Sequence, residues 1–149
     1  VVAEKCRITG TVRAFDEDTR YLIRRRIEEM ASAVAGSYGA EVNVDYLMGY
    51  PPLVNDEDEC QRFFAVAPRA LGDSIEVITM EKLMPAEDFS YYVQQIPGCF
   101  MFVGAGNPAK DAVYPHHHSR FDIDEDALLH GVKLLIAMAD SCLKGEQFV

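Results

Sequence analysis

Three of the four histidines stand side by side in the segment of residues 114–122. Neutral imidazole is a ligand for zinc, manganese, nickel and cobalt. Neighbouring side chains of an extended loop point in different directions, so His116, His117 and His118 cannot all reach one ion. One or at most two of them are therefore candidate metal ligands, and a polar surface loop is the alternative interpretation.

A second candidate is the acidic pair Glu87 and Asp88, which stands beside Phe89. The pair could line an active site. Two acidic residues in the first turn of a helix also complement the helix dipole, however, and that reading needs no ligand. The pair by itself therefore assigns no chemistry.

Arg13 is the third candidate. It alternates with apolar residues on a predicted strand, which places it on the polar face together with Arg7. A guanidinium group can hold a substrate carboxylate through two parallel hydrogen bonds. An exposed arginine on a solvent face is the ordinary alternative.

The spacing of apolar residues predicts the elements that carry these side chains. Alternation over residues 6–14 and 42–46 predicts two half-buried strands. Between them we expect a helix with Asp16 as its N-cap and Gly39 just past its end. Two strands and one helix are too little for an independent domain, so this region is predicted to be half of a four-stranded split-βαβ sandwich. The expected core stripe of the helix is Ile23, Ile27, Met30, Val34 and Tyr38.

The prolines and acidic residues of positions 51–59 predict a boundary near residue 54. After it we expect a helix over residues 58–71 that Pro68 kinks or stops, and a final helix from near Asp124 to just before Gly145. The other expected elements are a strand over 75–79, a helix over 87–95, a central strand over 99–103 and a loop over 104–108. The core stripe of the final helix is predicted to be Leu128, Val132, Leu135, Met138 and Cys142. The predicted fold class is α/β, with mixed α+β character.

Composition limits the classes of function. The chain has 149 residues, 49% of them hydrophobic, which suits one globular domain. A net charge of -10 argues against binding to a nucleic-acid backbone or to an anionic membrane surface. No apolar run is long enough to cross a membrane, and no signal peptide is visible. The four scattered cysteines are expected to be reduced thiols of a cytoplasmic protein.

Five short motifs, taken in order, cover essentially the whole chain. Together they resemble the C-terminal part of the metal-dependent aminoacylase and carboxypeptidase-type amidohydrolases, in the branch with hippurate hydrolase and the plant auxin-conjugate hydrolases. The motifs are Gly-Thr-x-Arg-x-Phe-Asp at residues 10–16, Gly-Tyr-Pro-Pro-x-Val-Asn-Asp at 49–56, Ala-Glu-Asp-Phe-Ser at 86–90, Pro-Gly-x-Phe-x-Phe-x-Gly-x-Gly-Asn at 97–107 and His-x-x-x-Phe-Asp-x-Asp-Glu-Asp-Ala-Leu at 117–128.

The resemblance implies an α/β catalytic domain that carries two divalent ions (Zn, Mn, Ni or Co) and an inserted lid domain that often forms a homodimer. Residues 1–54 would then be part of the lid or dimerisation domain. Residues 55–149 would be the C-terminal segment of the catalytic metallohydrolase domain. The implied reaction is cleavage of the amide bond of an N-acyl amino acid, or of a small peptide-like amide, by metal-activated water.

The resemblance also implies roles for single residues at matching positions. His117 would bind one metal ion, while His116 and His118 would support that ligand or the loop. Arg13 would contact the carboxylate of the substrate. The remaining positions assigned to substrate binding and the pocket wall are Glu87, Asp88, Gly104, Gly106 and Asn107.

Some positions depart from the family pattern. Pro85 stands where the family usually has glycine, Ser119 replaces a common proline, and Pro68 interrupts a helix that is normally continuous. The family's other metal ligands and its general-base glutamate match nothing in this chain, so no catalytic residue is assigned here. We therefore predict that the isolated chain does not turn over substrate.

Two other functions stay open at this point. The chain could be a truncated module for dimerisation or interaction, because unpaired sheet edges and an uncovered core face favour association. It could also be a small metal carrier that uses residues 116–118. What precedes Val1 in the natural gene would separate the enzyme from the module.

Overall fold

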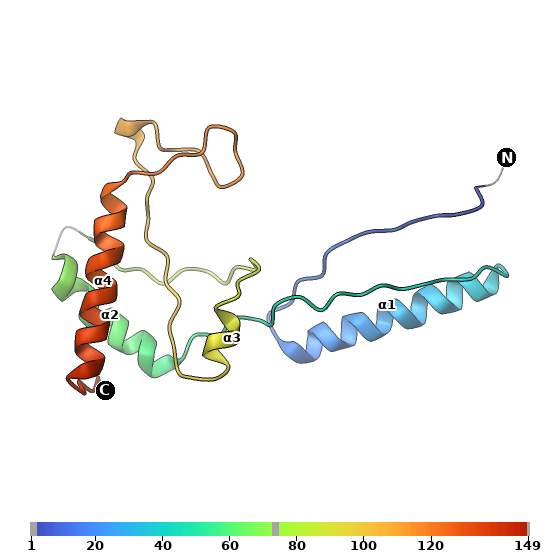
Figure 1. Cartoon of the computed structure of the whole chain (residues 1–149), viewed down its shortest axis with the longest axis horizontal. Coiled ribbons are helices and arrows are strands. Elements are labelled where there is room, and N and C mark those ends of the chain that lie inside the picture. The colour runs from blue at the N-terminus through green and yellow to red at the C-terminus, as the bar shows by residue number, and fades with distance from the viewer. Residues whose placement is uncertain (1–2, 73–74, 149) are drawn as a thin grey trace. The chain divides into compact units, whose positions relative to one another are not determined.

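The computed structural model describes residues 3–72 and 75–148, and the chain divides into two compact units. Unit 1 contains Val1–Val54 and Lys82–Gln94, and unit 2 contains Asn55–Glu81 and Gln95–Val149. Figure 1 labels the helices of each unit. No helix of the described ranges is long and apolar enough to cross a membrane. The chain thus passes from unit 1 to unit 2 after Val54, and residues 82–94 return to unit 1. The assignment of these parts to a lid and a catalytic domain stays a prediction.

Unit 1 is built around helix α1, Glu17–Ser37. Asp16 caps its N-terminus, and the Asp16 side chain accepts a hydrogen bond from the backbone N–H of Thr19 at 2.7 Å. Gly39 lies two residues past the end with φ 67°, a left-handed conformation that glycine adopts readily. The predicted start, end and caps of this helix are confirmed.

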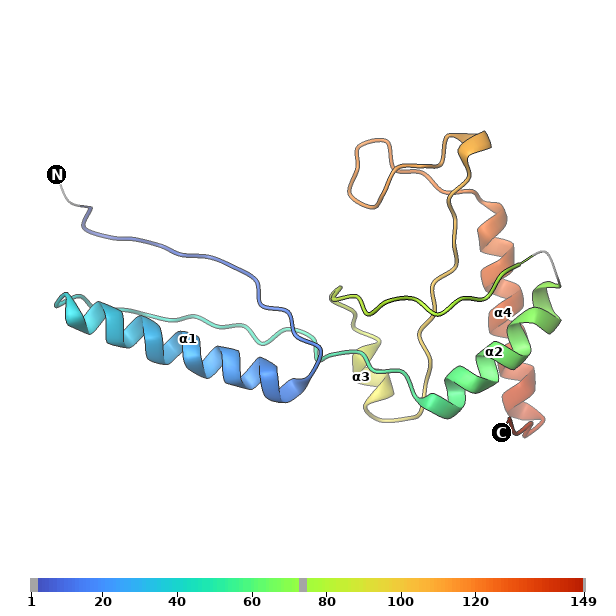
Figure 2. The same ribbon diagram turned by 180° about the vertical axis from the view of Figure 1, so that it is seen from behind.

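The segment of residues 40–50 runs back along α1, as Figure 2 shows. The buried side chain of Arg20 donates a hydrogen bond to the carbonyl of Met48 at 2.5 Å. One turn further, the guanidinium of Arg24 lies 5.9 Å from the centre of the Tyr46 ring. Two arginines of α1 therefore hold the returning chain.

The expected core stripe of α1 is wrong for this chain. Met30 and Val34 are 57% and 58% exposed, and Tyr38 is 85% exposed. An amphipathic helix buries its apolar stripe only if a second apolar layer covers it. Within the described residues, an extended segment and not a sheet packs on α1. The apolar stripe therefore stays exposed to solvent.

Unit 2 begins with α2, Glu57–Leu71, whose N-cap Asp56 accepts a hydrogen bond from the N–H of Glu59 at 3.1 Å. Pro68 does not stop this helix, which continues through its last turn to Leu71. A proline so close to the end removes one N–H donor and leaves the bonds of the preceding turns intact. The helix ends where the N–H of Gly72 donates to the carbonyl of Pro68 at 2.9 Å.

Helix α4, Asp126–Leu143, packs against α2. Figure 1 shows the two helices crossing in unit 2. The buried residues of the two helices are Val66 and Ala67 on α2 and Ala127, Leu134 and Ser141 on α4.

The predicted core stripe of α4 is therefore on the wrong face. Leu128 and Val132 are 60% and 52% exposed, and Leu135 is 74% exposed. Because α4 is apolar on several sides, the 3.6-residue period does not single out one face. The buried residues of α4 recur every seven positions, about two helical turns, so they lie along one side of the helix.

Two short helical pieces complete the described secondary structure: α3, Ser90–Val93, and the 3-10 helix η1, Pro108–Lys110. The predicted helix over residues 87–95 is thus much shorter than expected. Ser90 is fully buried, and its hydroxyl donates to the carbonyl of Glu87 at 2.6 Å. This local bond holds residues 87–90 in a turn, which replaces the first turn of the longer helix.

The four predicted strands, over residues 6–14, 42–46, 75–79 and 99–103, are not strands in this structure. Within residues 3–72 and 75–148 the one β-pairing is an isolated antiparallel bridge between Asn107 and Ala112. These segments are extended, but a strand also needs a neighbouring backbone for its hydrogen bonds. The helical part of the predicted α/β class is therefore present, whereas the described residues contain no sheet and the split-βαβ sandwich is not confirmed.

Candidate functional site

The three consecutive histidines lie in a tight turn between η1 and α4. The N–H of His118 donates to the carbonyl of Pro115 at 3.1 Å, and the N–H of Phe121 donates to the carbonyl of His118 at 3.0 Å. His117 has φ 69°, in the left-handed region that residues with a Cβ seldom adopt. The turn thus holds His117 in a backbone conformation unlike that of its neighbours.

Ring contacts organise the two outer histidines. The His118 ring stacks on Tyr114 with centres 4.5 Å apart and planes at 13°, and the guanidinium of Arg120 lies 4.4 Å from the Tyr114 ring. The His116 ring meets Phe121 edge to face at 5.0 Å. Among the described residues, His117 has no such ring contact. This arrangement suits a structural role for the outer two rings, and the assignment of His117 as the ligand stays a prediction.

These residues alone do not form a metal centre. All three histidines are exposed, and the described parts of the chain contain no group of three or more His, Cys, Asp or Glu side chains that could hold an ion. A protein zinc site takes at least three protein ligands. One imidazole does not meet that requirement.

The loop of residues 104–107 is tied to the start of α4. The backbones of Asn107 and Ala112 pair in both directions, at 2.8 and 3.1 Å. The Asn107 side-chain amide donates to the Asp124 carboxylate at 2.6 Å, and the N–H of Asp124 donates to the carbonyl of Ala105 at 2.8 Å. The loop therefore has a defined shape without any ligand.

The two glycines of this loop are not forced by packing within the described chain. A Cβ at Gly104 would meet nothing within 4 Å, and one at Gly106 would meet the carbonyl oxygen of Ala112 at 3.6 Å, an ordinary contact. Their assignment to a pocket wall stays a prediction.

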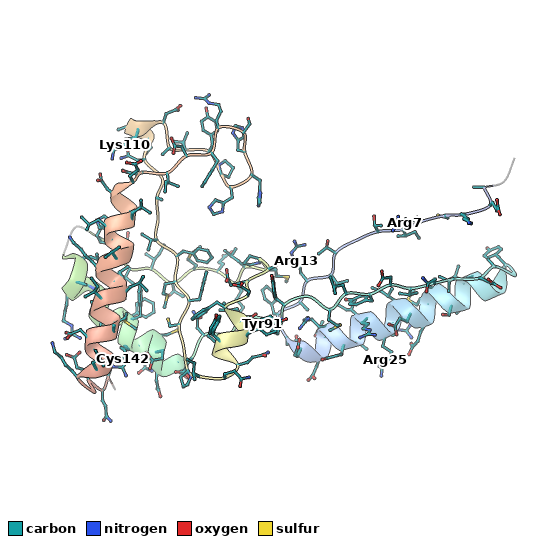
Figure 3. All side chains as sticks on the ribbon, in the orientation of Figure 1. Arg7, Arg13, Arg25, Tyr91, Lys110 and Cys142 are labelled. Atoms are coloured by element: carbon teal, nitrogen blue, oxygen red, sulfur yellow. The ribbon has the colours of Figure 1, made fainter. Side chains whose placement is uncertain are left out.

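For Asp124 the sequence predicted only that the final helix starts nearby. Its carboxylate accepts hydrogen bonds from Asn107, from the Lys110 ammonium and from the N–H of Asp126. These donors, Asn107 first, lower the pKa of Asp124 to about 2, and the same contact raises the pKa of Lys110. Figure 3 shows Lys110 beside the first turn of α4. An Asp-x-Asp pattern before a helix could have signalled this anchor.

The predicted residues of unit 1 lie in two different segments. Glu87 and Asp88 precede α3, and the Glu87 carboxylate accepts a hydrogen bond from the N–H of Phe89 at 3.1 Å. Glu87 thus closes a local turn, while Asp88 is exposed. Arg13 is exposed on the extended segment before α1 (Figure 3). Arg13, Glu87 and Asp88 belong to unit 1, and the histidine turn and the loop of residues 104–107 belong to unit 2.

The family is settled by sequence. Residues 2–141 match the profile of peptidase family M20/M25/M40. The chain belongs to this family. That assignment confirms the resemblance inferred from the five motifs.

Relatives within this family carry names that specify hydrolysis. A Bacillus subtilis protein named as an amidohydrolase, YhaA, is 37% identical over 93% of this chain and 35% of its own length. The N-acetyldiaminopimelate deacetylase of Brevibacillus brevis is 30% identical over 91% of this chain and 34% of its own. An Arabidopsis thaliana protein, IAA-amino acid hydrolase ILR1-like 4, is 34% identical over 93% of this chain and 32% of its own. No solved structure matches the chain significantly.

The chain spans about a third of the length of these relatives. The comparisons support the hydrolase class in general.

Proposed function

We propose that this chain is the C-terminal segment of a metal-dependent amidohydrolase. The whole protein would cleave the amide bond of an N-acyl amino acid or of a small peptide-like amide. The match of residues 2–141 to a peptidase family, with relatives named as an amidohydrolase, a deacetylase and an amino acid hydrolase, supports this proposal. The short span of the chain relative to those relatives supports its being a segment.

In this proposal the residues of the chain have divided tasks. His117 supplies one ligand to a centre of two divalent ions whose other ligands belong to sequence outside this chain. Arg13 holds the carboxylate of the substrate. Glu87, Asp88 and the loop of residues 104–107 shape the pocket. The general base belongs to the rest of the enzyme, which makes the isolated chain inactive.

The metal ions, the partner and the location of the enzyme are part of the same proposal. The ions would be Zn, Mn, Ni or Co, all of which accept imidazole ligands. The partner would be a second copy of the whole protein, joined through the lid. The net charge of -10 supports the absence of nucleic-acid and membrane partners, and we place the enzyme in the cytoplasm.

The assignment of His117 can be tested in the full-length enzyme. His117→Ala should lower bound metal and hydrolysis of N-acyl amino acids together, by about 100-fold in activity, because a metal site with an imidazole removed loses both affinity and geometry. Metal content per protomer and initial rates measure the two effects. His130→Ala, a histidine substitution on α4 outside the histidine turn, is the control and should keep its metal. Full activity with unchanged metal content in His117→Ala would show that the ligand has been misassigned.

A specific observation favours a second candidate function, a module for association without catalysis. Large apolar side chains are open on α1 and α4, including Met30 at 57%, Leu135 at 74% and Ile136 at 65% exposure. Open apolar faces of this kind mark interaction surfaces. The intact mass of the natural protein separates the two functions: a mass near 16.7 kDa supports the module, and a much larger mass supports the enzyme.

A further inference from the structure

Unit 2 contains a pair of cysteines that the proposed reaction does not use. The Sγ atoms of Cys60 and Cys99 lie 3.7 Å apart, and both side chains are half-buried. The other two cysteines, Cys6 and Cys142, are exposed, and all four are free thiols. Two thiols that are far apart in sequence thus touch in the folded chain.

The segment that carries Cys99 is fixed to the start of α2 on both sides of the cysteine. On one side, the N–H of Asp56 donates to the carbonyl of Gly98 at 3.0 Å. On the other side, the Asn55 side chain donates to the carbonyl of Phe100 at 3.0 Å and accepts from its N–H at 2.8 Å. The backbone around Cys99 is therefore held in register with the first residues of α2.

Cys60 is fixed by the same part of the chain. It lies in the first turn of α2, where its N–H donates to the carbonyl of Asp56 at 3.0 Å. Asp56 thus bonds both to the segment of Cys99 and to Cys60 itself. These backbone bonds hold the two cysteines near each other, and their sulfurs lie in contact.

We propose that Cys60 and Cys99 form a redox-active dithiol, at which a small disulfide such as oxidised glutathione introduces an intramolecular disulfide. The sulfurs already lie in contact, and closing the bond brings them from 3.7 Å to about 2.05 Å. The inference does not depend on the proposed hydrolase function. It rests on the geometry of unit 2 alone.

The reaction proceeds by two thiol–disulfide exchanges. The Cys60 thiolate attacks one sulfur of oxidised glutathione and forms a mixed disulfide, which releases one glutathione thiolate. Cys99 then attacks the Cys60 sulfur and releases the second glutathione. The two protein thiols lose two protons and two electrons, and the oxidant is reduced to two thiols.

The order of attack follows from the environment of Cys99. Burial first, and then its contact with Cys60, raise the pKa of Cys99 to about 12, with Glu59 and Asp56 adding to the effect. A thiol with so high a pKa is a poor first nucleophile. Once Cys60 is in the mixed disulfide, Cys99 has its target within contact distance and needs no encounter in solution.

The product would link the first turn of α2 covalently to the segment of residues 98–100. The bond closes a loop between positions that are 39 residues apart. A cross-link of this span restricts the unfolded chain and so favours the folded form of unit 2. Oxidation would therefore raise the resistance of unit 2 to denaturant.

The test uses the Cys6→Ser/Cys142→Ser variant of the full chain, in which Cys60 and Cys99 are the two remaining thiols. After incubation with oxidised glutathione, the intact mass should be lower by two hydrogen atoms. Peptide mapping without reductant should give one cross-linked pair that contains residues 60 and 99. In the folded chain the disulfide should form at least about tenfold faster than in guanidinium chloride, because folding raises the effective concentration of one thiol near the other.

Matched variants decide the outcome. Adding Cys60→Ser or Cys99→Ser to this background should leave a single thiol, which ends either unmodified or as a stable glutathione adduct without a cross-link. Two glutathione adducts on the background variant, two thiols that still react with iodoacetamide, or equal rates of oxidation in the folded and denatured chain would each overturn the proposal.

Discussion

A single carboxylate, Asp124, connects the loop of residues 104–107 to α4 through Asn107 and Lys110. Its lowered pKa means that the folded chain favours the charged form. The stabilisation is therefore complete above the ordinary pKa of 3.8 and is lost as pH falls through about 2. The loop should keep its shape across the whole neutral range.

The pH dependence of this anchor can be measured. We expect the Asp124 carboxyl to titrate near pH 2 in an NMR experiment. The protection of the Asn107 and Ala112 amides, relative to their intrinsic exchange rates, should fall only when pH falls toward that value. Lys110→Gln should raise the pKa of Asp124 because it removes the ammonium donor. Lys133→Gln, a lysine substitution on α4, is the control and should not change the pKa of Asp124. Titration of Asp124 at an ordinary carboxyl pKa would contradict the anchor.

The proposed role of Arg13 makes a kinetic prediction. Arg13→Gln in the full-length enzyme should raise KM by roughly 10- to 100-fold for substrates with a free carboxylate, since a bidentate ion pair is lost. It should have little effect on kcat, or on analogues whose carboxylate is replaced by an amide. Arg7→Gln, on the same extended segment, is the matched control. Equal KM values for Arg13→Gln and the unchanged enzyme would remove Arg13 from the binding site.

At the scale of elements, the contact between α2 and α4 depends on one face of α4. Leu134 is 8% exposed and its neighbour Leu135 is 74% exposed. Leu134→Ala should lower the free energy of unfolding of unit 2 by about 2–3 kcal/mol, because it leaves a cavity. Leu135→Ala should change it by less than about 0.5 kcal/mol. Urea unfolding followed by circular dichroism measures both, and equal effects would show that the helix presents another face to α2.

The sequence predicted helices better than any other feature, and the reason is physical. Caps such as Asp16 and Asp56, and the turn at Gly39, act within a few residues, so they can be recognised locally. Strands depend on partners that lie elsewhere, and the segment of residues 99–103 shows that an apolar run alone does not make one. The buried face of α4 could not be predicted for the same reason, because contact with α2 determines it.

The candidate site shows the same division. The histidine turn was found because three consecutive histidines are easy to recognise in a sequence, and the motifs around it led to the correct family. The supporting contacts were not found, because Arg120 stacks on Tyr114 and pairs with Asp111 only once the turn has closed. Residue type therefore indicated where chemistry is expected, and tertiary contacts determined how the turn is held.

At the scale of the whole molecule, the central prediction concerns activity. The isolated chain should show no hydrolysis of N-acyl amino acids above background with Zn, Mn, Ni or Co, because its described residues do not complete a metal centre. The full-length enzyme should be active under the same conditions. Rates measured on both proteins at equal concentration test this. Metal-dependent turnover by the isolated chain would show that it carries a complete site of its own.

The pairing of α2 with α4 also has a consequence for protein synthesis. Helix α2 ends at Leu71 and α4 ends at Leu143, so at ~5–20 residues per second a ribosome completes α4 several seconds after α2. During that interval α2 lacks the helix that packs against it. The growing chain therefore passes through a period in which chaperone binding and aggregation compete with folding, and its length is set by the speed of translation.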